Sequence, residues 1–200
     1  SNKDINLTGK VRISVPEGLG IEIFTKYLKN FFKINNELEI ELVADSKFRN
    51  LTSKEVDISI GLSHPKSNKL KSWKLSNYKI QLYGSKSYIK ENQIIEYVSD
   101  LSNHKFVSYI DDMIDFPELK YLQETIANAK IVFRSNNLQA QLNAVKQGVG
   151  IAFLHSFIAK NEKELDVILK EKINLTREYW IIIHEDLINL KRIKVVVDFI

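Results

Sequence analysis

Apolar and polar residues recur along this chain with two different periods. Strict alternation is typical of a strand with one buried face, and residues 37–43 show it, with Leu38, Ile40 and Leu42 on one side. Apolar positions three and four residues apart predict helices instead. Together these patterns predict strands at 10–15, 37–43, 56–62, 70–75, 78–84, 105–110, 130–135, 151–155 and 179–185, and helices at 23–32, 117–127, 137–147 and 165–170.

For two segments the hydrophobic period alone does not settle the secondary structure. Ser76-Asn77 is a polar pair of the kind that marks turns, and it predicts that 70–75 and 78–84 are separate strands. The closing segment 190–200 mixes apolar and basic residues around a valine-rich run. It suits a helix or a strand, and local sequence does not decide between them.

The order of these elements indicates how the chain is organised. Strands and helices alternate in two successive cycles, which predicts an α/β protein made of two βαβ-type lobes. We expect the chain to cross between the lobes near residues 80–86 and 177–184. One lobe would then contain residues 3–84 and 184–200, and the other residues 85–183.

Two of the seven glycines, Gly148 and Gly150, lie one residue apart in "LNAVKQGVGIAFLHSF" (142–157). A phosphate-binding loop needs a strand, then glycines, then a helix, so that helix N–H groups face the anion. Here the helix comes first and the strand last. We therefore predict that Gly148 ends the helix in a left-handed conformation and that Gly150 permits a tight turn into a buried strand.

Composition narrows the class of protein. The chain has 200 residues and no cysteine, which excludes disulfides and thiolate chemistry. It has 29 Lys and Arg against 25 Asp and Glu, and this weak positive charge is spread over the chain as expected for a solvated surface rather than a nucleic-acid groove. No run is long enough to span a membrane and no signal-peptide pattern opens the chain, so we expect a cytoplasmic protein.

Catalytic and metal-binding patterns are not found in the sequence. It contains neither a Gly-x-Ser-x-Gly elbow nor a phosphate-loop motif. The histidines His64, His104, His155 and His184 are scattered singly, so metal binding is unsupported. Asp111, Asp112 and Asp115 form an acidic cluster, but apolar residues interrupt it and a solvated loop is the better interpretation. We expect a protein that is not an enzyme and has no cofactor.

Polar residues gather where predicted strands end, which is where open α/β sheets bind ligands. The loop 15–20 follows the first strand and precedes a helix, so its N–H groups could hold an anion, or it could be an ordinary loop. Glu17 either stabilises the helix start or faces a ligand. Ser135, Asn136 and Asn137 offer oxygens that cap a helix. A lone histidine such as His155 is more typical of a hydrogen-bonded structural residue than of a ligand-binding one.

Six stretches, in order, resemble the effector-binding domain of LysR-type transcriptional regulators. They are "GKVRISVP", "VDISIGL" (56–62), "LYGSKSYIKEN" (82–92), "LSNHKFVSY" (101–109), "NAVKQGVGIAFLHSFIA" (143–159) and the terminal "VDFI". The resemblance covers nearly all of residues 7–200. It implies a two-lobed fold like that of the type 2 periplasmic binding proteins, with crossover strands between the lobes and a small-molecule site in the cleft. It also implies a winged helix-turn-helix DNA-binding domain that would precede this region in the whole protein.

The resemblance also places site residues and partners on this sequence. The strand ends and the resemblance together give the candidate effector-binding residues, which are Pro16, Glu17, Gly18, Leu19, Gly61, Leu62, Ser63, Ser108, Tyr109, Ser135, Asn136, Asn137, Leu154 and His155. The implied assembly is a homodimer or tetramer, formed through helices such as 21–33 and 118–127 and strand edges such as 37–43 and 130–135. DNA would be contacted only through the preceding domain.

The chain departs from the family pattern at three places. Gly84-Ser85-Lys86 stands where Ala-Ser-Pro is common, His155 stands where proline is usual, and Glu17-Gly18 replaces a hydroxyl-bearing residue in the first loop. Two other classes remain open. A solute-binding protein of a transport system shares the implied fold but needs an export signal, and a small α/β enzyme would need catalytic residues in the cleft.

Overall fold

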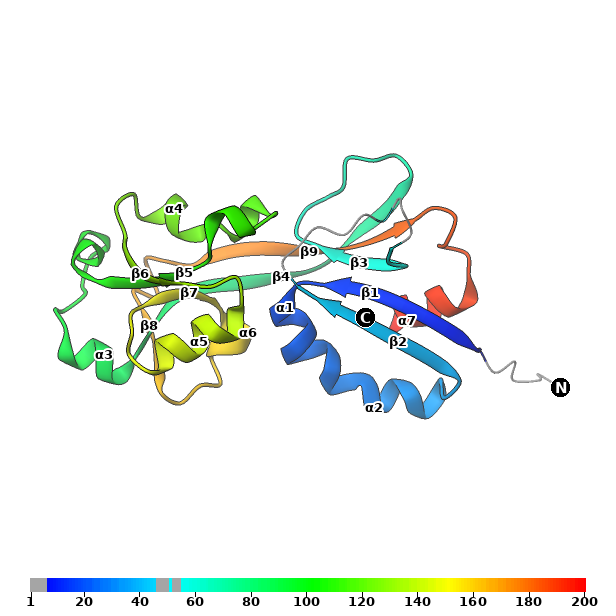
Figure 1. Cartoon of the computed structure of the whole chain (residues 1–200), viewed down its shortest axis with the longest axis horizontal. Coiled ribbons are helices and arrows are strands. Elements are labelled where there is room, and N and C mark those ends of the chain that lie inside the picture. The colour runs from blue at the N-terminus through cyan, green and yellow to red at the C-terminus, as the bar shows by residue number, and fades with distance from the viewer. Residues whose placement is uncertain (1–6, 46–50, 52–54) are drawn as a thin grey trace. The chain divides into compact units, whose positions relative to one another are not determined.

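The computed structural model describes residues 7–45, 51 and 55–200 (Figure 1). The chain divides into two compact units. Unit 1 comprises residues 1–76 and 178–200, and unit 2 comprises residues 77–177. Two strands, β4 (Leu70–Ser85) and β9 (Leu175–His184), each contain one of these boundaries. The boundaries predicted from the sequence, after residues 84 and 183, fall further along the same two strands.

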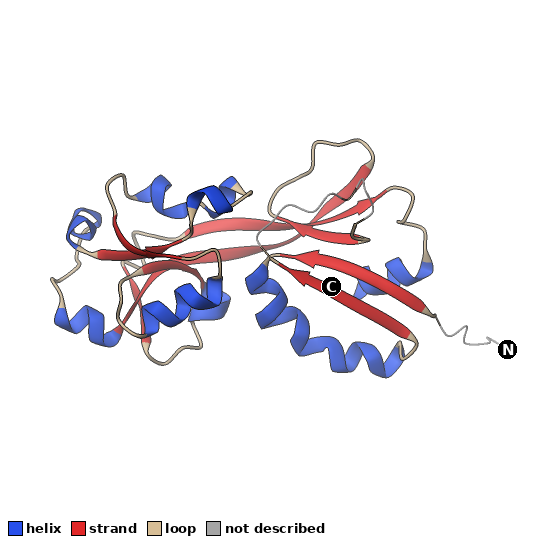
Figure 2. Ribbon diagram, viewed as in Figure 1, coloured by secondary structure: helices blue, strands red, loops and turns tan. Residues whose placement is uncertain are grey.

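Strands and helices follow one another in most of the order that the hydrophobic pattern predicts (Figure 2). The other strands are β1 (Gly9–Val15), β2 (Leu38–Ala44), β3 (Ile58–Gly61), β5 (Lys105–Ser108), β6 (Lys130–Arg134), β7 (Ala152–His155) and β8 (Leu165–Ile168). The α-helices are α1 (Glu17–Leu19), α2 (Thr25–Ile34), α3 (Lys86–Glu91), α4 (Tyr121–Thr125), α5 (Leu138–Lys146), α6 (Ser156–Ala159) and α7 (Lys191–Phe199). A π-helical turn η1 (Gly20–Phe24) and the 3₁₀ turns η2 (Val98–Asn103), η3 (Asp111–Met113) and η4 (Pro117–Leu119) complete them. None of the helices in the described part of the chain has the length and apolar character that a membrane span requires.

Unit 1 is built on a mixed sheet with strand order β2-β1-β3-β9. Strand β1 runs parallel to both of its neighbours, and β3 runs antiparallel to β9. The register pairs Gly9 with Leu38 and Val15 with Ala44, so β1 and β2 are matched along their whole length. Because β1 and β3 are parallel, their carboxyl ends lie at the same edge of the sheet.

The core of unit 1 lies between this sheet and the helices α2 and α7. The β1 residues Val11 and Ile13 have no exposed surface. The Phe199 ring of α7 lies 5.5 Å from that of Phe24 at the end of η1 and 4.7 Å from that of Phe31 in α2, measured between centroids. These contacts bury large aromatic surfaces and hold the two helices together.

The closing segment 190–200, undecided from the sequence, is the helix α7. Ile193 and Val196 are fully buried and stand three residues apart, which places them on one face of a helix. A strand would have put these two residues on opposite faces. Burial against β1 therefore selects the helix over the strand that the valine run also allowed.

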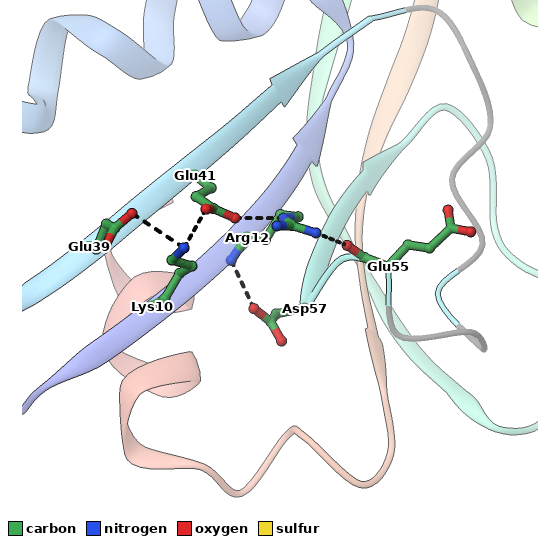
Figure 3. Close-up of polar contacts among 6 residues, drawn as sticks. All are labelled: Lys10, Arg12, Glu39, Glu41, Glu55 and Asp57. Atoms are coloured by element: carbon green, nitrogen blue, oxygen red, sulfur yellow. Dashed lines mark hydrogen bonds and ion pairs between the residues drawn. The ribbon is translucent and has the colours of Figure 1, made fainter.

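A network of charged side chains covers the solvent side of β1 and β2 (Figure 3). The Lys10 ammonium lies 2.6 Å from a carboxylate oxygen of Glu41 and 3.5 Å from one of Glu39. The Arg12 Nε–H donates to Glu41 at 2.6 Å, and its backbone N–H donates to Asp57 at 2.8 Å. Hydrogen bonds from Lys10 and Arg12 lower the pKa of Glu41. The network links β1 to β2 and to the segment before β3.

The predicted turn at Ser76-Asn77 is wrong, because β4 is one continuous strand of 16 residues. Both side chains are exposed, so neither needs a turn to reach water. The strand order places β4 beside β9, and β7 and β8 pair with its second half. Pairing with neighbouring strands satisfies the backbone through this region and overrides the local turn preference.

The predicted helix at 165–170 is also wrong. Residues Leu165–Ile168 form strand β8, which pairs antiparallel with Leu82–Ser85 of β4. Leu165 and Ile168 are buried at its two ends. An apolar segment this short fits either structure, and the available edge of β4 decides. The predicted helix 117–127 is shorter than expected, since it consists of η4 and α4 separated at Lys120.

Unit 2 carries the glycine pair at the corner between α5 and β7. Gly148 has φ +76°, which confirms the predicted left-handed end of the helix. Gly150 has a different role from the predicted turn. A Cβ atom there would lie 2.6 Å from the Lys105 carbonyl oxygen, so glycine is needed for the close approach of two backbones. Next to it, the Ile151 N–H donates to that same carbonyl at 2.9 Å and joins the start of β7 to β5.

Candidate functional site

In unit 1, the segments that follow β1 and β3 lie at one edge of the sheet. The register Ser14↔Ser59 between these parallel strands places Pro16 and Gly61, two residues further along each strand, at the same level. The structure therefore brings together two groups of predicted site residues, 16–19 and 61–63. This edge is where open α/β sheets bind ligands.

The segment after β1 turns at once into a helix. Pro16 has φ −56° and ψ 138°, outside the helical region, and its carbonyl accepts a hydrogen bond from the Gly20 N–H at 3.0 Å. Glu17 and Gly18 are buried and form the first turn. A Cβ atom at Gly20 would lie 2.7 Å from the Val15 side chain, so this turn packs directly on the end of β1. Whether Glu17 meets a ligand remains a prediction.

The segment after β3 changes from buried to exposed within three residues. Gly61 pairs with Trp180 of β9, and a Cβ atom on it would lie 2.6 Å from the side chain of Ile182. Leu62 is buried, whereas Ser63 is exposed. Of these three residues, Ser63 alone therefore presents a polar side chain to solvent.

In unit 2, the corresponding strand ends are joined by a hydrogen bond. Strands β5 and β6 are parallel, with Ser108 paired with Arg134. Immediately beyond that pair, the Ser135 N–H donates to the Ser108 carbonyl at 3.0 Å. The structure thus brings together two further groups of predicted site residues, Ser108-Tyr109 and 135–137.

Arg134, which belongs to no sequence motif, organises this region. Its guanidinium donates to the Tyr109 carbonyl and to the Asp111 carboxylate, both at 2.9 Å. The Gln123 amide donates to the other oxygen of Asp111 at 2.7 Å. Asp111 is therefore tied to neighbouring elements, although its cluster was interpreted as a solvated loop. A single arginine at a strand end, far in sequence from the acidic cluster, gave no local signal of this pairing.

The helix α5 begins at a capping residue, as predicted. Asn137 is the N-cap, and its side-chain oxygen accepts from the Ala140 N–H at 2.8 Å. The Ser135 hydroxyl accepts from the Asn137 N–H at 3.0 Å, and its carbonyl accepts from the buried Gln141 amide at 2.9 Å. Ser135 and Asn137 thus shape the start of α5, while the side chain of Asn136 is exposed between them.

His155 lies inside unit 2 at the end of β7. It is 3% exposed, and its Nε2 lies 3.1 Å from the Tyr121 hydroxyl. The Phe157 ring stacks on it at 5.4 Å, and the Tyr78 ring meets it edge-on at 5.2 Å. Burial lowers its pKa to about 4, so the imidazole is neutral at physiological pH. These contacts confirm the predicted structural role, and effector binding by His155 remains a prediction.

Leu154 is also buried, beside a small polar cluster that sequence reasoning missed. Leu154 is 1% exposed and pairs with Gln81 of β4. The Ser156 hydroxyl donates to the buried side-chain oxygen of Gln81 at 2.9 Å. Ser156 and Gln81 are 75 residues apart in sequence. Their contact follows from the pairing of β4 with β7, and neither residue belongs to a motif.

These groups offer hydroxyl, amide and backbone partners suited to holding a polar small molecule. Within the described part of the chain, no three His, Cys, Asp or Glu side chains gather in a way that could hold a metal ion. The polar groups follow two strand ends in each unit. Such an arrangement is chemically suited to binding a polar small molecule by hydrogen bonds.

Comparison with known sequences identifies similar proteins. The family described as the LysR substrate binding domain matches residues 6–200. An uncharacterised helix-turn-helix-type transcriptional regulator from Haemophilus influenzae is 29% identical over 173 residues, which cover 83% of this chain and 59% of that protein. The chain thus spans somewhat more than half the length of this relative.

Solved structures show the same fold. The regulatory domain of CrgA, a LysR-type transcriptional regulator from Neisseria meningitidis, superposes with a TM-score of 0.83 at 17% identity, covering 96% of this chain and 97% of that one. The regulatory domain of AphB from Vibrio vulnificus superposes with a TM-score of 0.76 at 21% identity, covering 96% and 98%. These likenesses confirm the predicted two-lobed α/β fold.

Proposed function

Because this chain belongs to the LysR substrate binding domain family, we propose that it senses a small-molecule effector for a longer transcription regulator. In that protein a helix-turn-helix domain would contact DNA, as the name of the similar H. influenzae protein suggests. The segment described here would bind the effector and carry no catalytic activity. Homodimers or tetramers would couple effector binding to the placement of the DNA-binding domains.

The single observation that supports this proposal most is the placement of polar groups after parallel strands. In unit 2 the Ser135 N–H donates to the Ser108 carbonyl, so two predicted binding segments meet directly. In unit 1 the segments 16–19 and 61–63 share one sheet edge. We propose that these residues, with Leu154 and His155, contact the effector.

The proposed mechanism is a shift between pre-existing arrangements of the oligomer. A ligand changes such an equilibrium only to the extent that it binds one arrangement more tightly than the other. Coupling between an effector site and a second site is typically about 1–3 kcal/mol, or roughly 5–150-fold in affinity. No covalent step is needed, which fits a site of hydroxyls, amides and backbone groups.

Two other functions were compatible with the sequence. A solute-binding protein of a transport system has a similar fold, but the family match and the named relatives favour a regulator. A small α/β enzyme would need a nucleophile or acid–base pair, and the sequence contains neither a Gly-x-Ser-x-Gly elbow nor a phosphate-loop motif to supply one. His155, the one histidine among the proposed site residues, has a pKa lowered to about 4 by burial, which makes it a weak base at neutral pH.

A thermal-shift screen with amino acids, aromatic acids, sugars and polyamines would identify the effector class. A ligand at about 100 times its dissociation constant stabilises the folded state by roughly 2.7 kcal/mol, which is readily detected. With a ligand in hand, Asn136→Ala tests the site, because Asn136 is exposed two residues after the end of β6. Loss of one hydrogen bond of about 1 kcal/mol would weaken binding roughly fivefold.

The matched control is Asn128→Ala, because Asn128 is an exposed asparagine just before the other end of the same strand. It should leave the affinity unchanged. Equal effects of the two substitutions would show that the effector does not bind at the carboxyl end of β6. Turnover of a ligand by the wild-type chain would contradict the proposal that it is not an enzyme.

A further inference from the structure

Unit 1 contains an apolar pocket of about 250 Å³ that lies largely outside the proposed effector site. Its walls come from the helical segment after β1, from β3 and β4, and from the end of α7. The lining residues are Leu19, Ile23, Phe24, Tyr27, Ile60, Leu75, Phe199 and Ile200. Leu19 is the only one that also belongs to the predicted effector-binding residues, so this pocket can be tested separately.

The back of the pocket is held firmly and its mouth is open. Phe24 is 7% exposed and Ile60 is 3% exposed. The Phe199 ring packs edge-on against Phe24, with 5.5 Å between centroids, so these side chains cannot easily collapse into the space. Leu75 is half-buried and Tyr27 is 56% exposed, which leaves the pocket accessible from solvent.

The chemistry of the lining limits what can bind. Seven of the eight side chains are hydrocarbon and the eighth, Tyr27, carries one hydroxyl. A charged group or a peptide backbone would lose its hydrogen bonds to water here and regain too few. An apolar cavity of about 150 Å³ is large enough to bind benzene, so this pocket suits a somewhat larger ring.

We infer that this pocket in unit 1 is a binding site for an uncharged, ring-sized apolar molecule, separate from the proposed polar effector site. Binding replaces poorly held water with contacts to Phe24, Ile60 and Phe199. The dissociation constant for a small ring is roughly 0.1–1 mM, as expected for a ligand with few atoms.

Indole is the probe, titrated into the full 200-residue chain with its isoleucine δ1 methyls labelled for NMR. We expect saturable shifts at Ile23, Ile60 and Ile200, which line the pocket. Ile34 and Ile94 should not respond, although both are strongly exposed, at 84% and 78%. No saturable shift at the pocket methyls, or equal shifts at Ile34, would overturn the inference.

A filling substitution gives a second measurement. Leu75→Trp places a large side chain in the space from a half-buried strand position and should weaken indole binding at least tenfold. Ile34→Trp adds the same side chain outside the pocket and should leave binding unchanged. Wild-type affinity in a folded Leu75→Trp protein would overturn the inference, and the methyl map decides by itself if that variant does not fold.

A second copy of the chain is the competing occupant of the pocket. If the Ile60 and Ile200 methyls shift as the protein is concentrated without indole, a second copy of the chain fills the pocket and the inference is wrong. A shift at Ile23 alone reports self-association through the segment 21–33 and does not show that the pocket is filled. Failure of the effector screen with polar ligands would leave the indole result untouched, because the probe and the methyls report on unit 1 only.

Discussion

At the scale of single residues, long-range contacts give ordinary side chains their roles. His155 contacts Tyr121, which lies 34 residues earlier, and Arg134 binds Asp111, which lies 23 residues earlier. In each pair the hydrogen bond fixes the position of a polar side chain. Because His155 is buried, protonating it in the folded protein is unfavourable. This cost can be measured as a loss of stability at low pH.

His155 should make stability fall as the solution is acidified. Burial lowers its folded-state pKa from 6.5 to about 4. Above pH 6.5 the imidazole is neutral in both states, so it adds no pH dependence. Between pH 6.5 and 4 the unfolded chain takes up a proton that the folded chain refuses, and the free energy of unfolding drops by up to about 3 kcal/mol. Urea titrations at pH 7, 5 and 4 measure this loss.

In the same experiment, His155→Gln should remove most of this loss, because glutamine can still hydrogen-bond Tyr121 but does not ionise. His64→Gln is the control, since His64 is exposed. Burial also lowers the pKa of His104, so a smaller dependence of the same sign stays in both variants. If His155→Gln and the wild-type protein lost stability equally, His155 would not be the buried neutral group described here.

At the scale of elements, the corner between α5 and β7 shows two glycines meeting different demands. Gly148 adopts a left-handed backbone, and Gly150 lets β7 approach the backbone of β5. The left-handed backbone is a local requirement of the helix end, whereas the close approach is imposed by a neighbouring strand. The same difference explains β8, which became a strand because β4 was there to pair with it.

Gly150→Ala should therefore destabilise the protein more than Gly148→Ala. The added methyl at residue 148 would meet its nearest neighbour at 3.4 Å, so the cost is mainly the left-handed conformation, about 1–2 kcal/mol. At residue 150 the methyl would lie 2.6 Å from the Lys105 carbonyl oxygen. Two backbones must separate, and we expect a loss above about 2 kcal/mol. Denaturant unfolding of both variants ranks them, and the reverse order would contradict the close approach of β5 and β7.

At the scale of the whole molecule, the chain passes through two units and presents surfaces suited to another copy. β2 ends the strand order of unit 1, and an edge strand offers unpaired backbone groups. Ile21, just before α2, is 46% exposed. Both lie in segments that the family resemblance implies for dimerisation.

We predict that the chain self-associates and that Ile21→Glu weakens this association. A charge within an apolar interface must be desolvated, so the dissociation constant should rise at least tenfold. Sedimentation over a range of concentrations measures it. Ile94→Glu is the control, because Ile94 is 78% exposed in unit 2 and lies outside the implied interface segments. A wild-type chain that stays monomeric at high concentration would contradict the prediction.

Sequence alone determined the features that depend on neighbours along the chain. The alternation at 37–43, the cap at Asn137 and the left-handed Gly148 are each fixed within a few residues, because side-chain direction, capping and backbone sterics are local. The family resemblance, confirmed by the match over residues 6–200, rests on such stretches in order.

Only the tertiary structure decided what depends on distant partners. The continuity of β4 through Ser76-Asn77, the strand at β8 and the helix at α7 were settled by available sheet edges and by burial. The same holds for Arg134, for the His155–Tyr121 pair and for the apolar pocket of unit 1. Long-range hydrogen bonding and burial depend on the folded chain as a whole, so they cannot be predicted from a short stretch of sequence.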